Sequence, residues 1–196
     1  MKLNRTPVVL LIVAVLLGGV VYLQQTIPPP VKSEAQLLFG FEEADVRSLN
    51  LKTLEQNLSF VKNAPPNPAT WQMTSPNQVR ANDASVAYLL NAIASANSAA
   101  PLTAPTAKQA EFGFDSPLAT VELTLKDSKT HRLILGKPNF NRTSLYAQID
   151  PQPGSELKIF LVSLDFENAV NRPLSEWQQV ATMPTPKAPP PKATKP

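Results

Sequence analysis

The sequence has no cysteine, and among its 196 residues there is one histidine and only six glycines. The lack of cysteine excludes disulfides, thiolate zinc sites, iron–sulfur clusters and a cysteine nucleophile. A single imidazole excludes a histidine-rich metal site. The four glycines beyond the apolar N-terminal run form neither a G-x-G-x-x-G fingerprint nor a P-loop. We therefore expect no cofactor.

The net charge of +3 does not indicate nucleic-acid binding once the charges are located. Five of the 18 basic residues lie near the two ends, which leaves 13 against 15 acidic residues in between. Binding to phosphate backbones needs a clustered basic face, and none is visible here. We expect no nucleic-acid partner. The five terminal basic residues are Lys2, Arg5, Lys187, Lys192 and Lys195.

An uncharged run from Thr6 to Val31 marks the N-terminal part of the chain. Its apolar centre, Val8–Leu23, spans about 24 Å as a helix, and residues 24–27 extend it toward the ~30 Å of a hydrocarbon core. This predicts one retained membrane span. A cleaved signal peptide is an alternative, although no small-x-small cleavage site follows the run. A buried core helix is a further alternative, but such helices are rarely apolar on every face.

The flanking charges predict how the chain is oriented. Basic residues beside a first span tend to stay cytoplasmic, so the N-terminus is expected inside and the main domain outside the cytoplasm. Residues 1–27 are then a cytoplasmic stub and anchor, and residues 28–36 a stiff proline-rich stalk. Residues 37–183 form the folded domain, and residues 184–196 a disordered proline- and lysine-rich tail.

Alternation of apolar and polar residues over 119–125 is typical of a half-buried strand. Helical spacing of apolar residues predicts a helix from Asn82 or Asp83 to the Asn97 region, and a second short helix over 164–170. The predicted fold class is α+β, with antiparallel hairpins and a meander in two sheet segments, packed by one or two helices. Further strands are predicted at 46–51, 58–62, 71–73, 131–135 (ended by Gly136), 145–149 and 157–162.

His131 is the one candidate imidazole base, and its position in a strand favours a surface or edge-strand side chain over catalysis. No G-x-S-x-G nucleophile motif accompanies it. The carboxylate pairs Glu42–Glu43 and Asp165–Glu167 lie near the stalk and on a predicted helix, where we expect solvated surfaces. The sequence therefore indicates no catalytic residue.

Metal binding by Asp115, Asp127 and Asp150 would require three separate turns to converge, and the calcium-loop spacing is missing. We predict no metal ligand. Phe112 and Phe114 are expected to pack under the sheet, while Asp115 shapes the turn before the following strand. An exposed aromatic docking patch is the alternative for these two rings.

Several short motifs follow one another in a characteristic order along the chain. They are Leu37–Phe41, Asp45–Leu51, Trp71–Met73, Glu111–Pro117, Leu133–Lys137, Tyr146–Ala147 and Ile159–Val162. Their order resembles the domain-of-unknown-function 4340 family over residues 37–177. In that family a "GLD-x-P" turn precedes a strand and an "LxLG" strand end precedes a "YV" strand. Phe114 stands where the family usually has Leu, and Ala147 where it often has Val.

The resemblance implies a membrane-tethered extracytoplasmic domain without established catalysis. Relatives accompany gliding-motility-type ABC transporters, and the single domain with a proline-rich tail is similar to cyanobacterial versions. This similarity implies a plasma or thylakoid membrane, with the main domain in the periplasm or the thylakoid lumen. We expect a non-enzymatic binding or scaffold domain with a membrane-protein partner. An extracytoplasmic hydrolase is one alternative, and a tether between membrane and wall through the tail is another.

Overall fold

The computed structural model of the chain describes residues 36–63, 70–154 and 156–179. The chain divides into two units, residues 1–34 and 35–196, and the second contains everything described. Val8–Leu23 and the tail 184–196 lie outside the described residues. Within the described part of the chain, no helix has both the length and the hydropathy needed to cross a bilayer.

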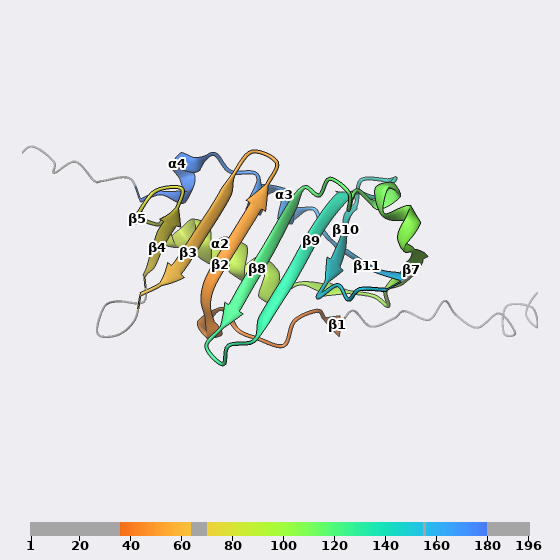
Figure 1. Cartoon of the computed structure of the whole chain (residues 1–196), viewed down its shortest axis with the longest axis horizontal. Coiled ribbons are helices and arrows are strands. Elements are labelled where there is room, and N and C mark those ends of the chain that lie inside the picture. Colours follow the sequence, from red (N-terminus) through yellow and green to blue (C-terminus); the bar gives the residue numbers. More distant parts are fainter. Residues whose placement is uncertain (1–35, 64–69, 155, 180–196) are drawn as a thin grey trace, which may run out of the picture. The chain divides into compact units, whose positions relative to one another are not determined.

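The described residues form one nine-stranded antiparallel sheet, with strand order β5-β4-β3-β2-β8-β9-β10-β11-β7 (Figure 1). A small second sheet pairs β1 (Gln36–Leu37) with β6 (Asn97–Ser98). The nine strands are β2 (Val46–Thr53), β3 (Asn57–Lys62), β4 (Trp71–Ser75), β5 (Val79–Arg80), β7 (Leu102–Pro105), β8 (Ala119–Leu125), β9 (Thr130–Pro138), β10 (Ser144–Ile149) and β11 (Glu156–Ser163).

The α+β class with antiparallel strands is confirmed, but the expectation of two sheet segments is wrong. The two meanders, β2–β5 and β8–β11, join through the pairing of β2 with β8, in which Leu49 lies opposite Leu123. Both residues are buried. Because each meander begins with a strand buried on one face, pairing these two strands extends one core instead of forming two.

Helix α2 (Asp83–Ala94) covers one face of the sheet. Its N-cap is Asn82, whose side chain accepts a hydrogen bond from the Ala84 backbone N–H at 3.1 Å. Val86, Leu89, Leu90 and Ile93 recur at helical spacing and are fully buried. The helix ends at Ala94, short of the predicted Asn97 region, because residues 97 and 98 pair with β1.

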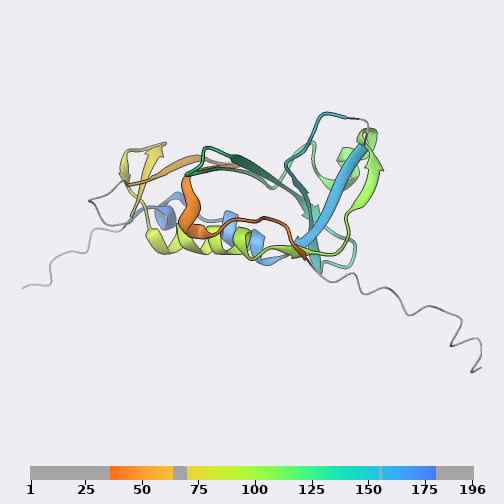
Figure 2. The ribbon, with the colours of Figure 1, turned by 90° about the horizontal axis from the view of Figure 1, so that it is seen from below.

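Helices follow each meander along the chain, and they lie on the same side of the sheet: α2 follows the first meander, and two further helices follow the second. Helix α3 (Asp165–Val170) confirms the predicted second helix, and α4 (Leu174–Trp177) follows it. Figure 2 shows α2, α3 and α4 together below the curved sheet. Trp177 is fully buried, and its ring centroid lies 5.5 Å from that of Phe60 in β3. The end of the described chain is therefore fixed to the core.

Candidate functional site

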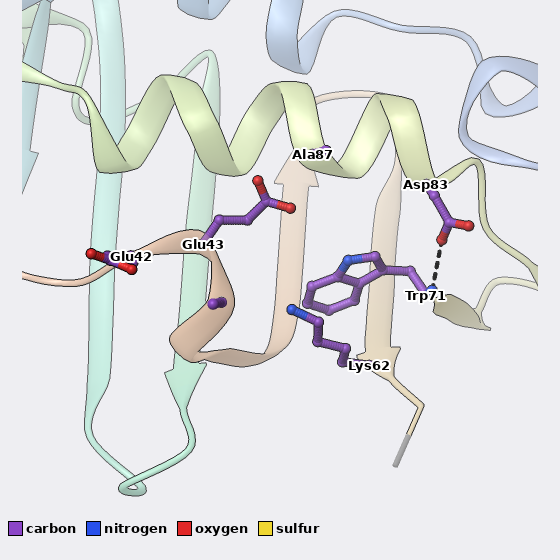
Figure 3. Close-up of a pocket in the computed structure, with 7 residues that line it drawn as sticks. Glu42, Glu43, Lys62, Trp71, Asp83 and Ala87 are labelled. Atoms are coloured by element: carbon purple, nitrogen blue, oxygen red, sulfur yellow. Dashed lines mark hydrogen bonds between the residues drawn. The ribbon is translucent and has the colours of Figure 1, made fainter. Parts of the chain in front are cut away.

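A groove lies between the segment 37–44 and one flank of α2. It consists of two adjoining hollows of about 540 and 600 Å³ that share Glu42 and Glu43 as lining residues. The first hollow also contacts Lys62 and Trp71, and Figure 3 shows its residues. We call this feature, from Asp83 to Ser95 along α2, the acidic groove.

The helix wall of the acidic groove follows from the sequence of α2. Asp83, Ala87, Asn91 and Ser95 are spaced four apart, so they lie along one flank of the helix, beside the buried face. Ala87 is small and Asn91 is exposed, which leaves space above this flank. The groove therefore exists because α2 presents short side chains there.

The opposite wall of the acidic groove is the extended segment before β2. Phe39 and Phe41 are buried, whereas Gly40 and Glu42 between and after them are exposed. The backbone N–H of Leu38 donates to the Ala96 carbonyl at 2.9 Å, which ties this wall to the end of α2. The short 3-10 helix η1 (Glu43–Asp45) then turns the chain into β2.

The groove carries an excess of negative charge, with Glu42, Glu43 and Asp83 against Lys62. Asp83 is occupied structurally: Oδ1 accepts from the Trp71 N–H at 2.7 Å, and Oδ2 pairs with Arg80 at 3.3 Å. The Lys62 amine lies 5.4 Å from the Trp71 ring centroid, a cation–π arrangement. Glu42 also forms a capping box with Asp45 at the start of η1. Among the described residues, the two glutamates are the groove carboxylates that pair with no basic side chain.

Neither Glu42 nor Glu43 has an ion-pair partner among residues 36–63, 70–154 and 156–179. Glu42 is exposed and Glu43 is half-buried. Figure 3 shows the Glu43 side chain rising toward α2 beside Ala87, while Lys62 enters from β3. A half-buried carboxylate attracts a cation more strongly than a fully solvated one, because water screens it less. The sequence predicted these glutamates to be solvated, since it gave no signal that α2 lies opposite them.

His131 is partly exposed, as a surface residue would be, but the alternative of an edge strand is wrong. β9 lies inside the sheet between β8 and β10, and the His131 side chain is 25% exposed. Its ring packs against Phe39 and Phe41 at centroid distances of 5.7 and 5.5 Å. Its Nδ1 lies 2.8 Å from Oδ2 of Asp150. The ring joins β9 to the wall of the acidic groove.

The other carboxylates are distributed over separate elements. Asp150 contacts His131, Asp127 pairs with Lys129 in the β8–β9 turn at 2.9 Å, and Asp115 is exposed in the segment before β8. In the part of the chain that the structure describes, no group of three or more His, Asp or Glu side chains is placed to hold a metal.

Asp165 and Glu167 lie on α3, as the sequence predicts. Asp165 accepts a hydrogen bond from the Ser163 hydroxyl at 2.9 Å. Neither residue lines the acidic groove, whose walls are the segment 37–44 and α2.

The two phenylalanines of the segment 111–117 pack against the sheet, as predicted, and both are half-buried. The ring centroid of Phe112 lies 5.0 Å from that of Tyr146 of β10, in an edge-to-face arrangement, and 6.1 Å from that of Phe114. They lie over Gly136, where a β-carbon would collide with the Phe112 carbonyl and come within 3.0 Å of the Phe114 ring. Gly136 therefore permits this close approach and does not end the strand: β9 continues to Pro138, which pairs with Leu145 of β10.

These features define an antiparallel α+β domain with an acidic groove beside its long helix. The family model for the domain of unknown function DUF4340 matches residues 71–188, and the chain belongs to this family. The match begins at Trp71 and includes both the segment 111–117 and the Gly136 strand that it covers. No curated protein and no solved structure matches the chain.

Proposed function

We propose that this chain is a non-enzymatic, membrane-anchored binding or scaffold domain, which displays the acidic groove outside the cytoplasm to a membrane-protein partner. The apolar run Val8–Leu23 and the basic residues before it support the anchor and its orientation. The resemblance to accessory proteins of ABC transporters supports a transporter complex as the setting.

The observation that carries this proposal is the pair of unneutralised carboxylates, Glu42 and Glu43, on the wall of an open groove. The groove runs along α2 from Asp83 to Ser95, which is about 18 Å at ~1.5 Å per residue. An extended peptide advances ~3.1 Å per residue, so about six residues fit. The preferred occupant is a basic peptide segment, because lysine or arginine supplies the charge that the groove lacks.

A photo-crosslinking experiment on the full chain in its native membranes tests this function. A photoreactive amino acid replaces Ala87 inside the groove or, as the control, exposed Asn50 on the opposite face of the sheet. We expect a discrete membrane-protein adduct at stoichiometric yield from position 87 and none from position 50. Recovery of the chain alone from both positions would contradict the proposal.

The charge requirement is tested by the double variant Glu42→Gln and Glu43→Gln, which keeps side-chain shape and removes both charges. Glu55→Gln, in the exposed β2–β3 turn, is the matched control. The adduct at position 87 should fall several-fold in the double variant and stay constant in the control. Equal yields in all three chains would show that the carboxylates do not bind the partner.

Membrane residence is tested separately by alkaline extraction and N-terminal sequencing. The chain should stay in the membrane fraction and retain residues 1–27. A mature chain that begins after residue 30 and is released by extraction would contradict the anchor.

A further inference from the structure

We infer that the C-terminal segment 180–196 of this same chain binds in the acidic groove, as an internal ligand that competes with the partner. This inference rests on the proposed function of the groove and adds its regulation. It starts from where the described chain ends, at Gln179.

Residue 179 is fixed at one end of the acidic groove. The Gln179 N–H donates to the Arg80 carbonyl at 3.0 Å, and Gln178 forms a β-bridge with Ala81. Arg80 in turn pairs with Asp83, a lining residue of the groove. The last described residue, Gln179, is therefore linked through Arg80 to Asp83, the lining residue at one end of the groove.

The length of the segment is sufficient. It has 17 residues, which span up to about 53 Å at ~3.1 Å per residue, against ~18 Å for the groove. The first lysine, Lys187, is eight residues from Gln179, or at most about 25 Å. Glu42 and Glu43 line both hollows, and the ~18 Å length of the groove is shorter than that span.

The composition of the segment complements the groove. It carries Lys187, Lys192 and Lys195 and no acidic residue, while Glu42 and Glu43 supply unpaired negative charge. Its six prolines favour the extended conformation, which makes no internal hydrogen bonds and lies in shallow grooves without prior unfolding. Attachment to Gln179 raises the effective concentration of the lysines to the millimolar range, so individually weak ionic contacts suffice.

Disulfide trapping tests the inference cleanly, because the chain has no cysteine of its own. The full-length variant Ala87→Cys with Ala188→Cys places one thiol in the groove and one between the tail lysines. The control, Asn50→Cys with Ala188→Cys, places the first thiol on the opposite face of the sheet. Under mild oxidation we expect the groove pair to form an intramolecular disulfide at least about tenfold faster than the control pair.

Charge dependence is a second readout of the same experiment. Adding Glu42→Gln and Glu43→Gln to the groove pair, or raising the salt concentration, should reduce its rate toward the control value. Equal rates for both pairs at low salt would overturn the inference. A disulfide that forms only between two molecules would also overturn it, and would identify the tail of a second copy as the occupant.

Truncation after Gln179 separates this inference from the proposed function. If both are correct, the truncated chain gives more partner adduct at position 87 than the full chain. A partner adduct without selective disulfide trapping would remove the internal ligand and leave the binding function intact. Selective trapping without any partner adduct, even after truncation, would remove the binding function and leave the internal contact.

Discussion

The backbone carbonyl of Phe112 occupies the space where a β-carbon of Gly136 would stand. The segment 111–117 and the strand end Leu133–Gly136 are far apart in the sequence. They pack so closely that a side chain at Gly136 would collide with the backbone of the segment 111–117. Gly113 is constrained as well: its φ is +78°, and a β-carbon there would lie 2.8 Å from the Lys137 backbone nitrogen. The glycines are thus needed for close backbone approach and not for flexibility.

Gly136→Ala should destabilise the domain by about 2 kcal/mol or more, because the obstructing atom is backbone and has no rotamer by which to move away. Urea unfolding of the detergent-solubilised full chain measures this change. Gly154→Ala is the matched control, since nothing lies within 4 Å of its added β-carbon. An unchanged unfolding midpoint in Gly136→Ala would show that the segment 111–117 does not pack there.

Asp150→Ala should lower the free energy of unfolding by about 1 to 3 kcal/mol. The Asp150 carboxylate contacts His131 Nδ1 at 2.8 Å and accepts from the Arg132 N–H at 2.7 Å, and its φ of 43° disfavours alanine. Asp150→Asn should lose less, because asparagine tolerates this φ and keeps an acceptor. Denaturant unfolding measures the free energy of unfolding of both variants. Asp115→Ala, at an exposed position, is the control and should stay within about 0.5 kcal/mol of the parent.

Asp127 should titrate below its usual range in the folded chain. Hydrogen bonds from the Lys129 side chain and backbone lower the pKa of Asp127, and the same contact raises the pKa of Lys129. The small stabilisation from Asp127 is present above its unfolded pKa and is lost as pH falls through the folded value; that from Lys129 is lost as pH rises through its own folded value. Carboxyl-carbon NMR titration measures the shift. Lys129→Ala should bring the pKa of Asp127 most of the way back to its usual value, and the control Lys126→Ala should leave it unchanged.

We predict that Asn139 stabilises the β9–β10 turn and that Phe140 does not. Asn139 Oδ1 accepts from the Thr143 and Ser144 N–H groups at 2.9 and 3.1 Å, while the Phe140 side chain is fully exposed. Asn139→Ala should cost about 1 kcal/mol and accelerate amide exchange across the turn. Phe140→Ser should leave both quantities unchanged. A large loss in Phe140→Ser would reveal a contact of that ring within the chain.

Trp177→Ala should cost about 3 to 5 kcal/mol, since it empties a fully buried site beside Phe60. Trp177→Phe should cost clearly less, because the indole Nε1 has no hydrogen-bond partner in the described part of the chain. Circular dichroism in urea follows both variants. Leu54→Ala, at a side chain 75% exposed, should be nearly neutral.

The spacing of apolar residues predicted most strands and the helices α2 and α3, because strand and helix periods differ and each buried face repeats locally. It did not predict the 3-10 helix Thr106–Phe112, in which no residue is buried. It did not predict the short strands β1, β6 and β7, whose side chains are mainly exposed and carry no periodic signal. The two-residue strand β5 was missed for the same reason. Periodicity therefore located the long strands and missed the short ones.

The candidate site divides in the same way. The sequence predicted Glu42 and Glu43 on a solvated surface and His131 on a surface or edge strand. Glu42 is exposed, whereas Glu43 and His131 are half-buried. The setting of the glutamates depends on α2, which begins at Asp83, far along the chain from them. The setting of His131 depends on β9, which lies between β8 and β10 inside the sheet. Such juxtapositions follow from packing and not from local propensity.

By itself, then, the sequence determined the α+β class, the family motifs and the absence of cysteine chemistry, because periodicity, glycine spacing and residue counts are local or additive properties. Tertiary structure alone decided that the two meanders form one sheet, that Phe112 covers Gly136, and that the segment 37–44 lies opposite α2. These are long-range contacts, selected because one continuous core buries more apolar surface than two separate ones. The acidic groove is a consequence of that selection.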